Sequence, residues 1–321
     1  MGRYIVRRLL YVLLVVLIIT MVTFVIFYVM PATNPAVTFA GKIPTPAIVK
    51  IVKHQFGLDK PIYVQYGLFV ARLFKGDKYG WPGLGFSYYT RSPIRAEIFS
   101  RALVTLQLAL GAAVIWLVLG IPIGIVSALK RRTFADRAAM GFALIGVSAP
   151  VFWLGLLGLF IFWQHLHWVL GTGYVPITHS ASQWFGHLIL PWVVLSLLFA
   201  AFYARMVRGN LLETMGEDYI RTARAKGLPE RTVVAKHGLR TSLTPVVTMF
   251  GMDFGLLLGG AIITESVFNL PGLGQYVVQA VRQGDLPTVL SVTVIAAFAV
   301  TFMNLIVDIV YAYLDPRVRY S

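Results

Sequence analysis

Two aspartates lie inside long apolar stretches of the sequence, where an ionisable side chain is costly. Asp253 stands within FGMDFGLLLGG, and Asp308 follows Asn304 by one helical turn near the end of another apolar run. An ionised group near the middle of a bilayer costs at least about 2.5–3.5 kcal/mol on insertion scales, so it is expected to face protein or water. Asp253 is therefore either a polar group that lines a pathway or the partner in a hydrogen bond between helices. For Asp308 we favour the hydrogen bond.

Glycines accompany Asp253 at intervals of four residues. Gly251, Gly255 and Gly259 form the small-xxx-small ridge that lets a second helix approach closely. The helix that carries Asp253 is thus expected to be packed in the interior of the protein.

Motifs for catalysis and metal binding are missing from the sequence. There is no cysteine and no G-x-x-x-x-G-K-[ST], H-E-x-x-H or G-x-S-x-G motif. His165 and His167 in FWQHLHW are two residues apart, which places them on different faces of a helix. An interfacial aromatic belt fits them better than a metal or proton-relay site. We expect no catalytic residue, no cofactor and no metal ion in this chain.

The elements that position these residues are predicted to be membrane-spanning helices. The 321-residue chain is 58% hydrophobic and 13% charged, with a mean hydropathy of +0.75, which is unusual for a soluble domain. A helix of roughly 20 apolar residues crosses a hydrocarbon core about 30 Å thick. Six runs reach this length: 9–30, 102–129, 138–164, 188–207, 245–266 and 289–311. No convincing cleavage site follows the first run, so we expect a retained helix and not a signal peptide.

Basic residues set the predicted orientation. Most of the 28 Lys and Arg residues lie at the N-terminus, in the loops 130–137 and 205–240, and in the tail at Arg317 and Arg319. These segments alternate along the chain and therefore share one side, which the positive-inside rule identifies as the cytoplasm. Basic loops also account for the net charge of +15 without a nucleic-acid partner. Segment 31–100 is basic too. It is long enough to be translocated across the membrane regardless of its charge, so we expect it on the external side.

The external segment is expected to form a small helical subdomain. Its apolar residues follow helical spacing on either side of GLDKP, where Gly57 and Pro61 break the run. The turn-rich stretch that follows contains Trp81, Tyr88 and Tyr89, which suit a lipid interface or a docked protein. The predicted organisation is a first helix with its cytoplasmic end in 1–30, an external segment in 31–100, and a five-helix core in 101–321 with a cytoplasmic loop at 208–244.

The cytoplasmic loop carries a short helix with small residues on one face. Ile220, Ala223 and Gly227 are spaced i, i+3, i+7 within EDYIRTARAKGLPERTVVAKHGLRTSLTPVV, and arginines surround them. Gly227 before Leu228 and Pro229 is typical of a helix stop. Positive charge would attract the helix to anionic lipid, but its apolar side chains are too small to insert deeply. A groove on another protein fits this face better.

The loop sequence DYIRTARAKGLPERTVVAKHGLRTSLTPVVT resembles the cytoplasmic signature loop of permease subunits of ABC importers, in the form found in the dipeptide/oligopeptide/nickel permease family. Further stretches resemble the same family over nearly the whole chain: RYIVRRLLYVLLVVLIITMVTFVIFYVMP, FGLDKPIYVQYGLFVARLFKGD, GGAIITESVFNLPGLGQ and LDPRVRYS. Two features depart from the pattern. The general signature E-A-A reads Arg221, Thr222 and Ala223 here, and KYGWPGL is an apparent insertion in the external segment.

This resemblance implies an all-α polytopic membrane protein with six transmembrane helices and the type I ABC importer permease fold. It implies that the loop contains a coupling helix, which docks in a cleft of a separate ATP-hydrolysing subunit with Gly227 at the close approach. The docking element by matching position comprises Tyr219, Ile220, Ala223, Arg224, Ala225, Lys226, Gly227, Leu228 and Pro229.

The resemblance also implies partners and a cargo. An extracytoplasmic binding protein would dock on the external segment and on the loop marked by Glu265, Phe268, Pro271, Gly272 and Gly274. A second homologous permease and two ATP-binding subunits, which would hold ATP and Mg, complete the expected complex in a bacterial or archaeal cytoplasmic membrane. Short peptides are the expected cargo, with nickel chelates or glutathione as alternatives. A stand-alone ion-coupled transporter driven through Asp253 and a membrane enzyme are alternatives of other classes.

Overall fold

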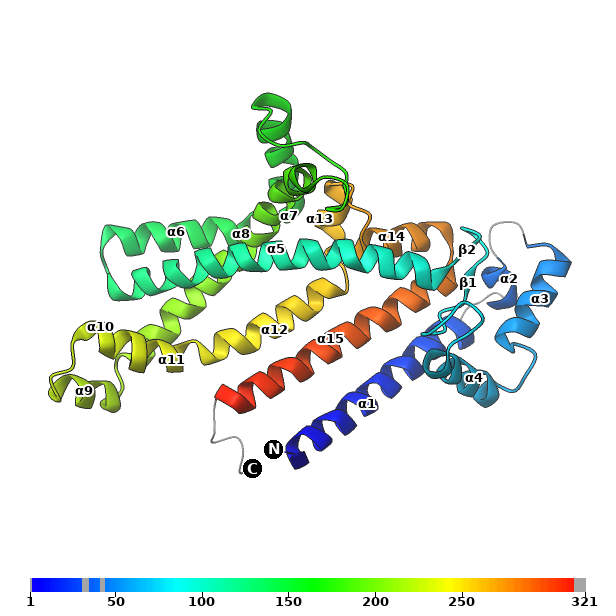
Figure 1. Ribbon diagram of the computed structural model, residues 1–321, viewed down its shortest axis with the longest axis horizontal. Helices are drawn as coiled ribbons and strands as arrows, with labels where there is room; N and C mark the ends of the chain where they lie inside the picture. The colour runs from blue at the N-terminus through cyan, green and yellow to red at the C-terminus, as the bar shows by residue number, and fades with distance from the viewer. Residues whose placement is uncertain (1, 31–34, 41–43, 315–321) are drawn as a thin grey trace. The chain divides into compact units, whose positions relative to one another are not determined.

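The computed structural model describes residues 2–30, 35–40 and 44–314, so the tail residues Arg317 and Arg319 and the motif LDPRVRYS lie largely outside it (Figure 1). The chain divides into two compact units, which are described here separately. The first unit comprises Met1–Leu106, Gly255–Glu265 and Pro271–Leu305, and the second comprises Gln107–Phe254, Ser266–Leu270 and Ile306–Ser321.

Helices dominate the described residues, and the all-α prediction is confirmed. Among the described residues, four helices are long and apolar enough to cross a membrane: α1 (Gly2–Phe24) with its continuation η1 (Val25–Val29), α5 (Ile94–Leu129), α8 (Ala181–Thr214) and α15 (Leu286–Leu314). Two bent pairs bring the number to six if each pair is one span. The first pair joins α6 (Phe134–Ser148) to α7 (Val151–Gly158) and η2 (Leu159–His165), and the second joins residues Glu230–Ser242 to α12 (Thr244–Leu258).

The third predicted span is broken and not continuous. The axes of its two halves differ by 100°, and the break falls at Ala149 and Pro150 (Figure 1). Pro150 has no N–H to donate, and a residue before proline is driven out of the helical region. Ala149 accordingly has the extended angles φ −83° and ψ 126°.

The fifth predicted span is shorter than its apolar run suggests. Helix α12 ends at Leu258, and the backbone turns at Gly260, whose φ of +120° is rarely adopted by other residues. The chain continues as α13 (Ile262–Val267) and α14 (Leu273–Gln283). The predicted end at residue 266 is therefore wrong, because hydropathy does not detect a glycine turn inside an apolar sequence.

The external segment is helical where the apolar spacing predicts it. It contains α2 (Pro35–Phe39), α3 (Pro46–Phe56) and α4 (Ile62–Lys75). Thr45 caps α3 by accepting a 3.3 Å hydrogen bond from the N–H of Ile48, and Gly57 ends it with φ +67°. The turn-rich stretch adds an antiparallel pair that was not predicted, β1 (Phe86–Ser87) with β2 (Ser92–Pro93).

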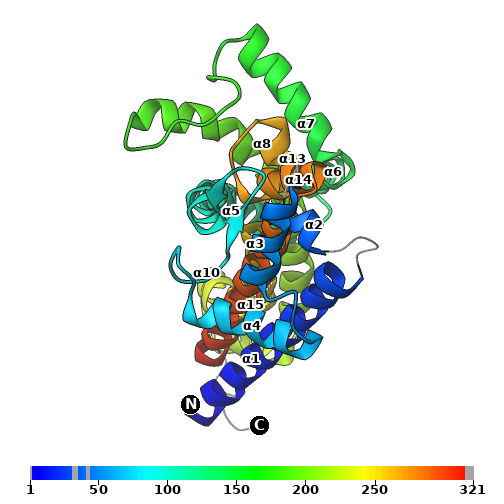
Figure 2. The ribbon, with the colours of Figure 1, turned by 90° about the vertical axis from the view of Figure 1, so that its right-hand side faces the viewer.

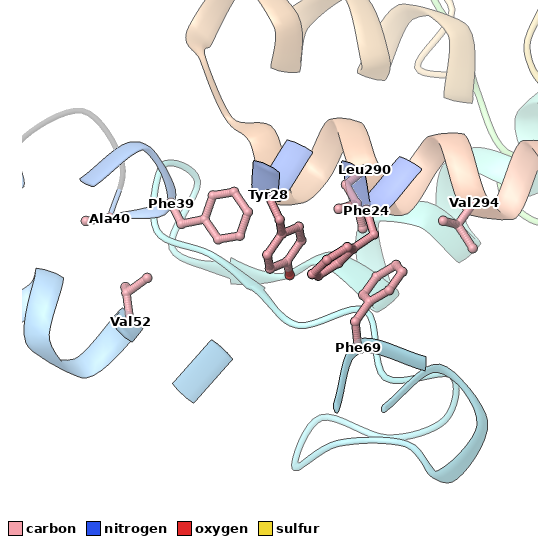
Figure 3. Packing of buried hydrophobic residues seen from close by; sticks show 8 residues of the cluster. All are labelled: Phe24, Tyr28, Phe39, Ala40, Val52, Phe69, Leu290 and Val294. Atoms are coloured by element: carbon pink, nitrogen blue, oxygen red, sulfur yellow. The ribbon is translucent and has the colours of Figure 1, made fainter. Parts of the chain in front are cut away.

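Figure 2 shows α2, α3 and α4 near α1 within the first unit. An aromatic cluster packs residues of these helices against α1 and α15 (Figure 3). Phe24 and Tyr28 stack with ring centroids 4.5 Å apart, and Phe39 meets Tyr28 edge to face at 5.2 Å. The remaining members of the cluster are Ala40, Val52, Phe69, Leu290 and Val294. The external segment thus has an apolar core that it shares with the ends of two long helices.

An ion pair fastens the turn between α5 and α6 to α8 in the second unit. The Arg208 guanidinium donates from Nε and Nη2 to the two carboxylate oxygens of Asp136, at 2.7 and 2.9 Å. The Ser127 hydroxyl and the N–H of Arg132 donate to the same carboxylate. Such a bidentate contact fixes the orientation of both side chains.

Candidate functional site

The loop between α8 and α12 contains a surface helix, α9 (Asp218–Ala225), at one end of the second unit (Figure 1). Ile220 and Ala223 are buried, and they pack against Val233, with Met215 beside them. The small-residue face that was expected to meet another protein is therefore covered by the loop itself. Ile220 and Ala223 anchor the helix within the loop, and docking by the predicted set stays a prediction.

The outward side of α9 is polar and carries exposed charges of both signs, including an ion pair of 3.5 Å between Arg221 and Asp218. Its exposed residues include Tyr219, Arg221, Arg224, Ala225, Lys226, Leu228 and Pro229. Arg224 donates to both carboxylate oxygens of Glu230, at 3.1 and 2.8 Å, and this contact lowers the pKa of Glu230 below its ordinary value. Exposed ion pairs of this kind contribute little to stability. The surface offered to a partner is therefore charged, with the apolar parts of Tyr219 and Leu228 among the cations.

Gly227 ends α9 in a left-handed conformation with φ +76°. Its N–H donates to the carbonyl of Arg224 at 2.9 Å, and that of Leu228 donates to the carbonyl of Ala223 at 3.4 Å. A Cβ added at Gly227 would have no neighbour within 4 Å among the residues that the structure describes. Backbone conformation, and not crowding within the loop, is what favours glycine here, and the space beside it is free for a partner.

The rest of the loop connects α9 to α8 and α12. It contains α10 (Glu230–Thr232), η3 (Val233–Gly238) and α11 (Leu239–Ser242). The Asn210 amide on α8 donates to the carbonyl of Ser242 at 3.2 Å, and the Tyr219 hydroxyl donates to Thr241 at 3.2 Å. Tyr219 thus joins α9 to α11, and Asn210 joins α11 to α8.

Asp253 has a hydrogen-bond partner on another helix. The hydroxyl of Tyr203 on α8 donates to Oδ2 of Asp253 on α12 at 2.8 Å. Tyr203 is fully buried, with its ring beside Trp116, whereas Asp253 is half-buried. The interhelical bond that was one of two alternatives for Asp253 is present. The pathway role stays a prediction, and the side chain of Asp308 lies outside the described residues.

In the importer that the resemblance implies, replacing Asp253 with asparagine (Asp253→Asn) is expected to retain most of the uptake activity. The carbonyl oxygen of the introduced amide would still accept from Tyr203, while the charge is lost. Uptake within about twofold of the wild type is the expected result, and Tyr203→Phe, which removes the donor, serves as the matched variant. Loss of concentrative uptake in Asp253→Asn, with normal assembly, would instead favour a carrier coupled to an ion through this carboxylate.

The three glycines around Asp253 face α15. A Cβ at Gly251 would collide with the side chain of Val307, one at Gly255 would lie 3.2 Å from Cβ of Met303, and one at Gly259 would lie 3.3 Å from Cβ of Ala296. Glycine therefore allows the backbone of α12 to lie close to α15, as the small-xxx-small spacing predicts.

Glu265 organises the turn between α13 and α14 from within. It is fully buried, and its carboxylate accepts from the Thr105 hydroxyl at 2.8 Å and from the N–H groups of Ala261 and Gln275 at 3.2 and 2.9 Å. Thr105 in turn accepts from the N–H of Leu273 at 2.8 Å. A buried carboxylate requires such donors, and here they tie the turn to α5.

Most residues predicted to form the external docking site are buried in the structure. Glu265, Phe268, Gly272 and Gly274 are inaccessible, and Pro271 is partly exposed. Any Cβ at Gly272 would collide with the carboxylate of Glu265. These residues shape the loop, while the exposed positions that a partner would touch are neighbours such as Ser266 and Asn269.

Within the part of the chain that the structure describes, no three His, Asp or Glu side chains gather into a metal site. His165 and His167 are both exposed near the end of η2.

Family models match almost the whole chain. Residues 120–320 match the model described as binding-protein-dependent transport system inner membrane component. Residues 1–109 match the model for the N-terminal part of the same kind of membrane component.

Curated relatives cover the chain from end to end. It is 41% identical to a putative peptide transport system permease protein of Brucella abortus (strain 2308), over 90% of each chain. It is 38% identical to a dipeptide transport system permease protein of Alkalihalophilus pseudofirmus and 37% identical to a glutathione transport system permease protein of Escherichia coli (strain K12), over 100% of each chain. A solved amino acid ABC transporter with histidines matches with a TM-score of 0.46 and 16% identity, over 70% of this chain and 94% of that one.

Proposed function

We propose that this chain, which belongs to the family of binding-protein-dependent transport system inner membrane components, is the permease subunit of an ATP-driven importer of short peptides. The family identifies the chain as an inner-membrane transport component, and permeases of this kind are not themselves enzymes. The ATP-hydrolysing partner, the composition of the complex and the cargo are the further steps that we propose.

Energy coupling is assigned to α9 and the turn at Gly227. The observation that carries this assignment is a surface helix whose apolar side packs within the loop and whose charged outward side is left uncovered by the described residues. Docking in the cleft of an ATP-binding subunit would supply that cover. Closure of two such subunits around ATP and Mg would then move α9, and its contacts with η3 and α11 would transmit the movement through the loop to α8 and α12.

The complete complex in this proposal contains a second homologous permease, two ATP-binding subunits and an extracytoplasmic binding protein. Both termini and loop 208–244 lie in the cytoplasm, and segment 31–100 lies outside with the turn around Glu265 and Gly272. Peptides are the proposed cargo because a relative named as a dipeptide permease matches over the full length. Glutathione, itself a peptide, is the second candidate, since a relative named for it matches equally completely.

Selection of the cargo is assigned to the binding protein. The described spans have few fixed charges near their middle, whereas a tight peptide site needs convergent groups for both charged termini. Exchanging the binding protein for a related one of different preference that still docks is expected to change the set of transported peptides accordingly. Competitive uptake with labelled peptides measures this set. A set that stays fixed while docking is intact would place selectivity in the permeases.

A further inference from the structure

A cavity in segment 31–100 brings basic side chains and a carboxylate together, whereas the described spans have few fixed charges near their middle. It has a volume of about 650 Å³, and its lining includes Lys50, His54, Arg72, Asp77, Lys78 and Tyr79. Pockets for small molecules usually measure about 300–1,000 Å³ and combine apolar surface with a few polar groups. All lining residues belong to the first unit, so the cavity is formed within one compact part of the chain.

The cationic side of the cavity is built from two helices and a turn. Lys50 and His54 are one helical turn apart on α3, which places them on the same face, and Arg72 lies on α4. Lys78 follows α4 in the turn, with Nζ 4.9 Å from the centroid of the Tyr79 ring. Lys50, His54 and Lys78 are exposed and are therefore accessible to a ligand.

The single carboxylate in the lining is held rigidly. Oδ1 of Asp77 accepts from the N–H of Tyr79 at 2.7 Å, and Oδ2 accepts from the N–H of Gly85 at 2.8 Å. The backbones of Asp77 and Gly80 also exchange two hydrogen bonds of 3.0 Å. Each carboxylate oxygen has a further lone pair, so Asp77 keeps acceptor capacity while its position is fixed.

From this arrangement we propose that the cavity binds the zwitterionic backbone of a short peptide. Lys50, His54 and Lys78 bind its carboxylate, Asp77 attracts its ammonium group, and Tyr79 and Ile51 contact its side chains. The site recognises the charges common to all unblocked peptides, so it does not select among side chains. It retains cargo close to the permease after release from the binding protein. The inference rests on the proposed transport of peptides.

Direct binding to the complex without its binding protein tests the site. The probe is labelled alanyl-alanine, measured by equilibrium dialysis against the permease complex in lipid nanodiscs. Because the cations are exposed, we expect weak saturable binding with a dissociation constant on the order of 1 mM. Lys50→Gln combined with Lys78→Gln is expected to weaken it at least fivefold. Lys53→Gln combined with Lys60→Gln, which changes two exposed lysines outside the cavity lining, is the matched control and should leave binding unchanged.

Peptides with one terminus blocked identify which charges of the ligand the site recognises. Alanyl-alanine amide, which lacks the carboxylate, should fail to compete, and the N-acetylated dipeptide should compete less well than the free one. Equal binding by the Lys50/Lys78 variant and the wild type would overturn the proposal. The proposal would also be overturned if the Lys50/Lys78 variant kept dipeptide binding but needed more binding protein to stimulate ATP hydrolysis. The cavity would then bind an acidic protein surface. The proposed transport function fails separately, if the wild-type complex shows no peptide uptake with its binding protein.

Discussion

Gly227→Trp is expected to leave the protein in the membrane while uptake falls below about a tenth of the wild-type rate. The side chain would extend into the space beside the turn, which is free in this chain and which we assign to the ATP-binding subunit. Any non-glycine residue at φ +76° also has a backbone cost of roughly 1–2 kcal/mol. Co-purification of the ATP-binding subunits and peptide uptake in cells are the two measurements.

Gly227→Ala separates the two causes. It has the same left-handed strain as Gly227→Trp but adds only a methyl group, which meets no neighbour within 4 Å. We expect it to retain the ATP-binding subunits and most of the uptake. Undiminished transport by Gly227→Trp would contradict the docking assignment. Equal loss in both variants would show that uptake depends on the backbone conformation of the turn and not on the size of the side chain.

Glu265→Ala is expected to lower the melting temperature of the purified protein by at least roughly 5 °C. Removal of the carboxylate leaves the Thr105 hydroxyl and the N–H groups of Ala261 and Gln275 without this acceptor. Each buried group left unsatisfied costs about 1–3 kcal/mol, and about 1 kcal/mol corresponds to roughly 2–4 °C in a protein of 150–250 residues. Glu265→Gln keeps one acceptor oxygen and should lose less. Thermal unfolding followed by intrinsic fluorescence measures the shift.

Gly272 provides an independent test of the same contact. Gly272→Ala places a methyl group against the Glu265 carboxylate and should destabilise the protein, whereas Gly67→Ala on α4 meets nothing within 4 Å and should not. Combining Gly272→Ala with Glu265→Ala removes the collision, so the two losses should be less than additive. Strict additivity would mean that the two residues do not meet in the folded protein.

The sequence predicted the apolar elements well because long hydrophobic runs and glycine stops are local signals. Its errors have a common cause. Helical spacing shows that Ile220 and Ala223 share a face, but it does not show that Val233, ten residues further on, covers that face. Likewise, an apolar run does not reveal where Pro150 or Gly260 redirects the backbone.

Contacts between distant segments had no signal in the sequence. Tyr203 lies in an apolar run with nothing to mark it as the partner of Asp253, fifty residues away. Glu265 next to a glycine-rich turn suggested an exposed loop, whereas the turn folds around the carboxylate. The charges around the external cavity come from α3, α4 and the following turn, and only the fold brings them together.

The central claim is that this permease works in an importer driven by ATP and supplied by a binding protein. The most direct measurement is uptake of a labelled dipeptide into vesicles that contain the reconstituted complex, with ATP inside the vesicles and the binding protein outside them. We predict uptake only when both are present, and no loss of uptake when ionophores dissipate the proton and sodium gradients. Concentrative uptake without ATP that disappears with the ion gradient would contradict the account.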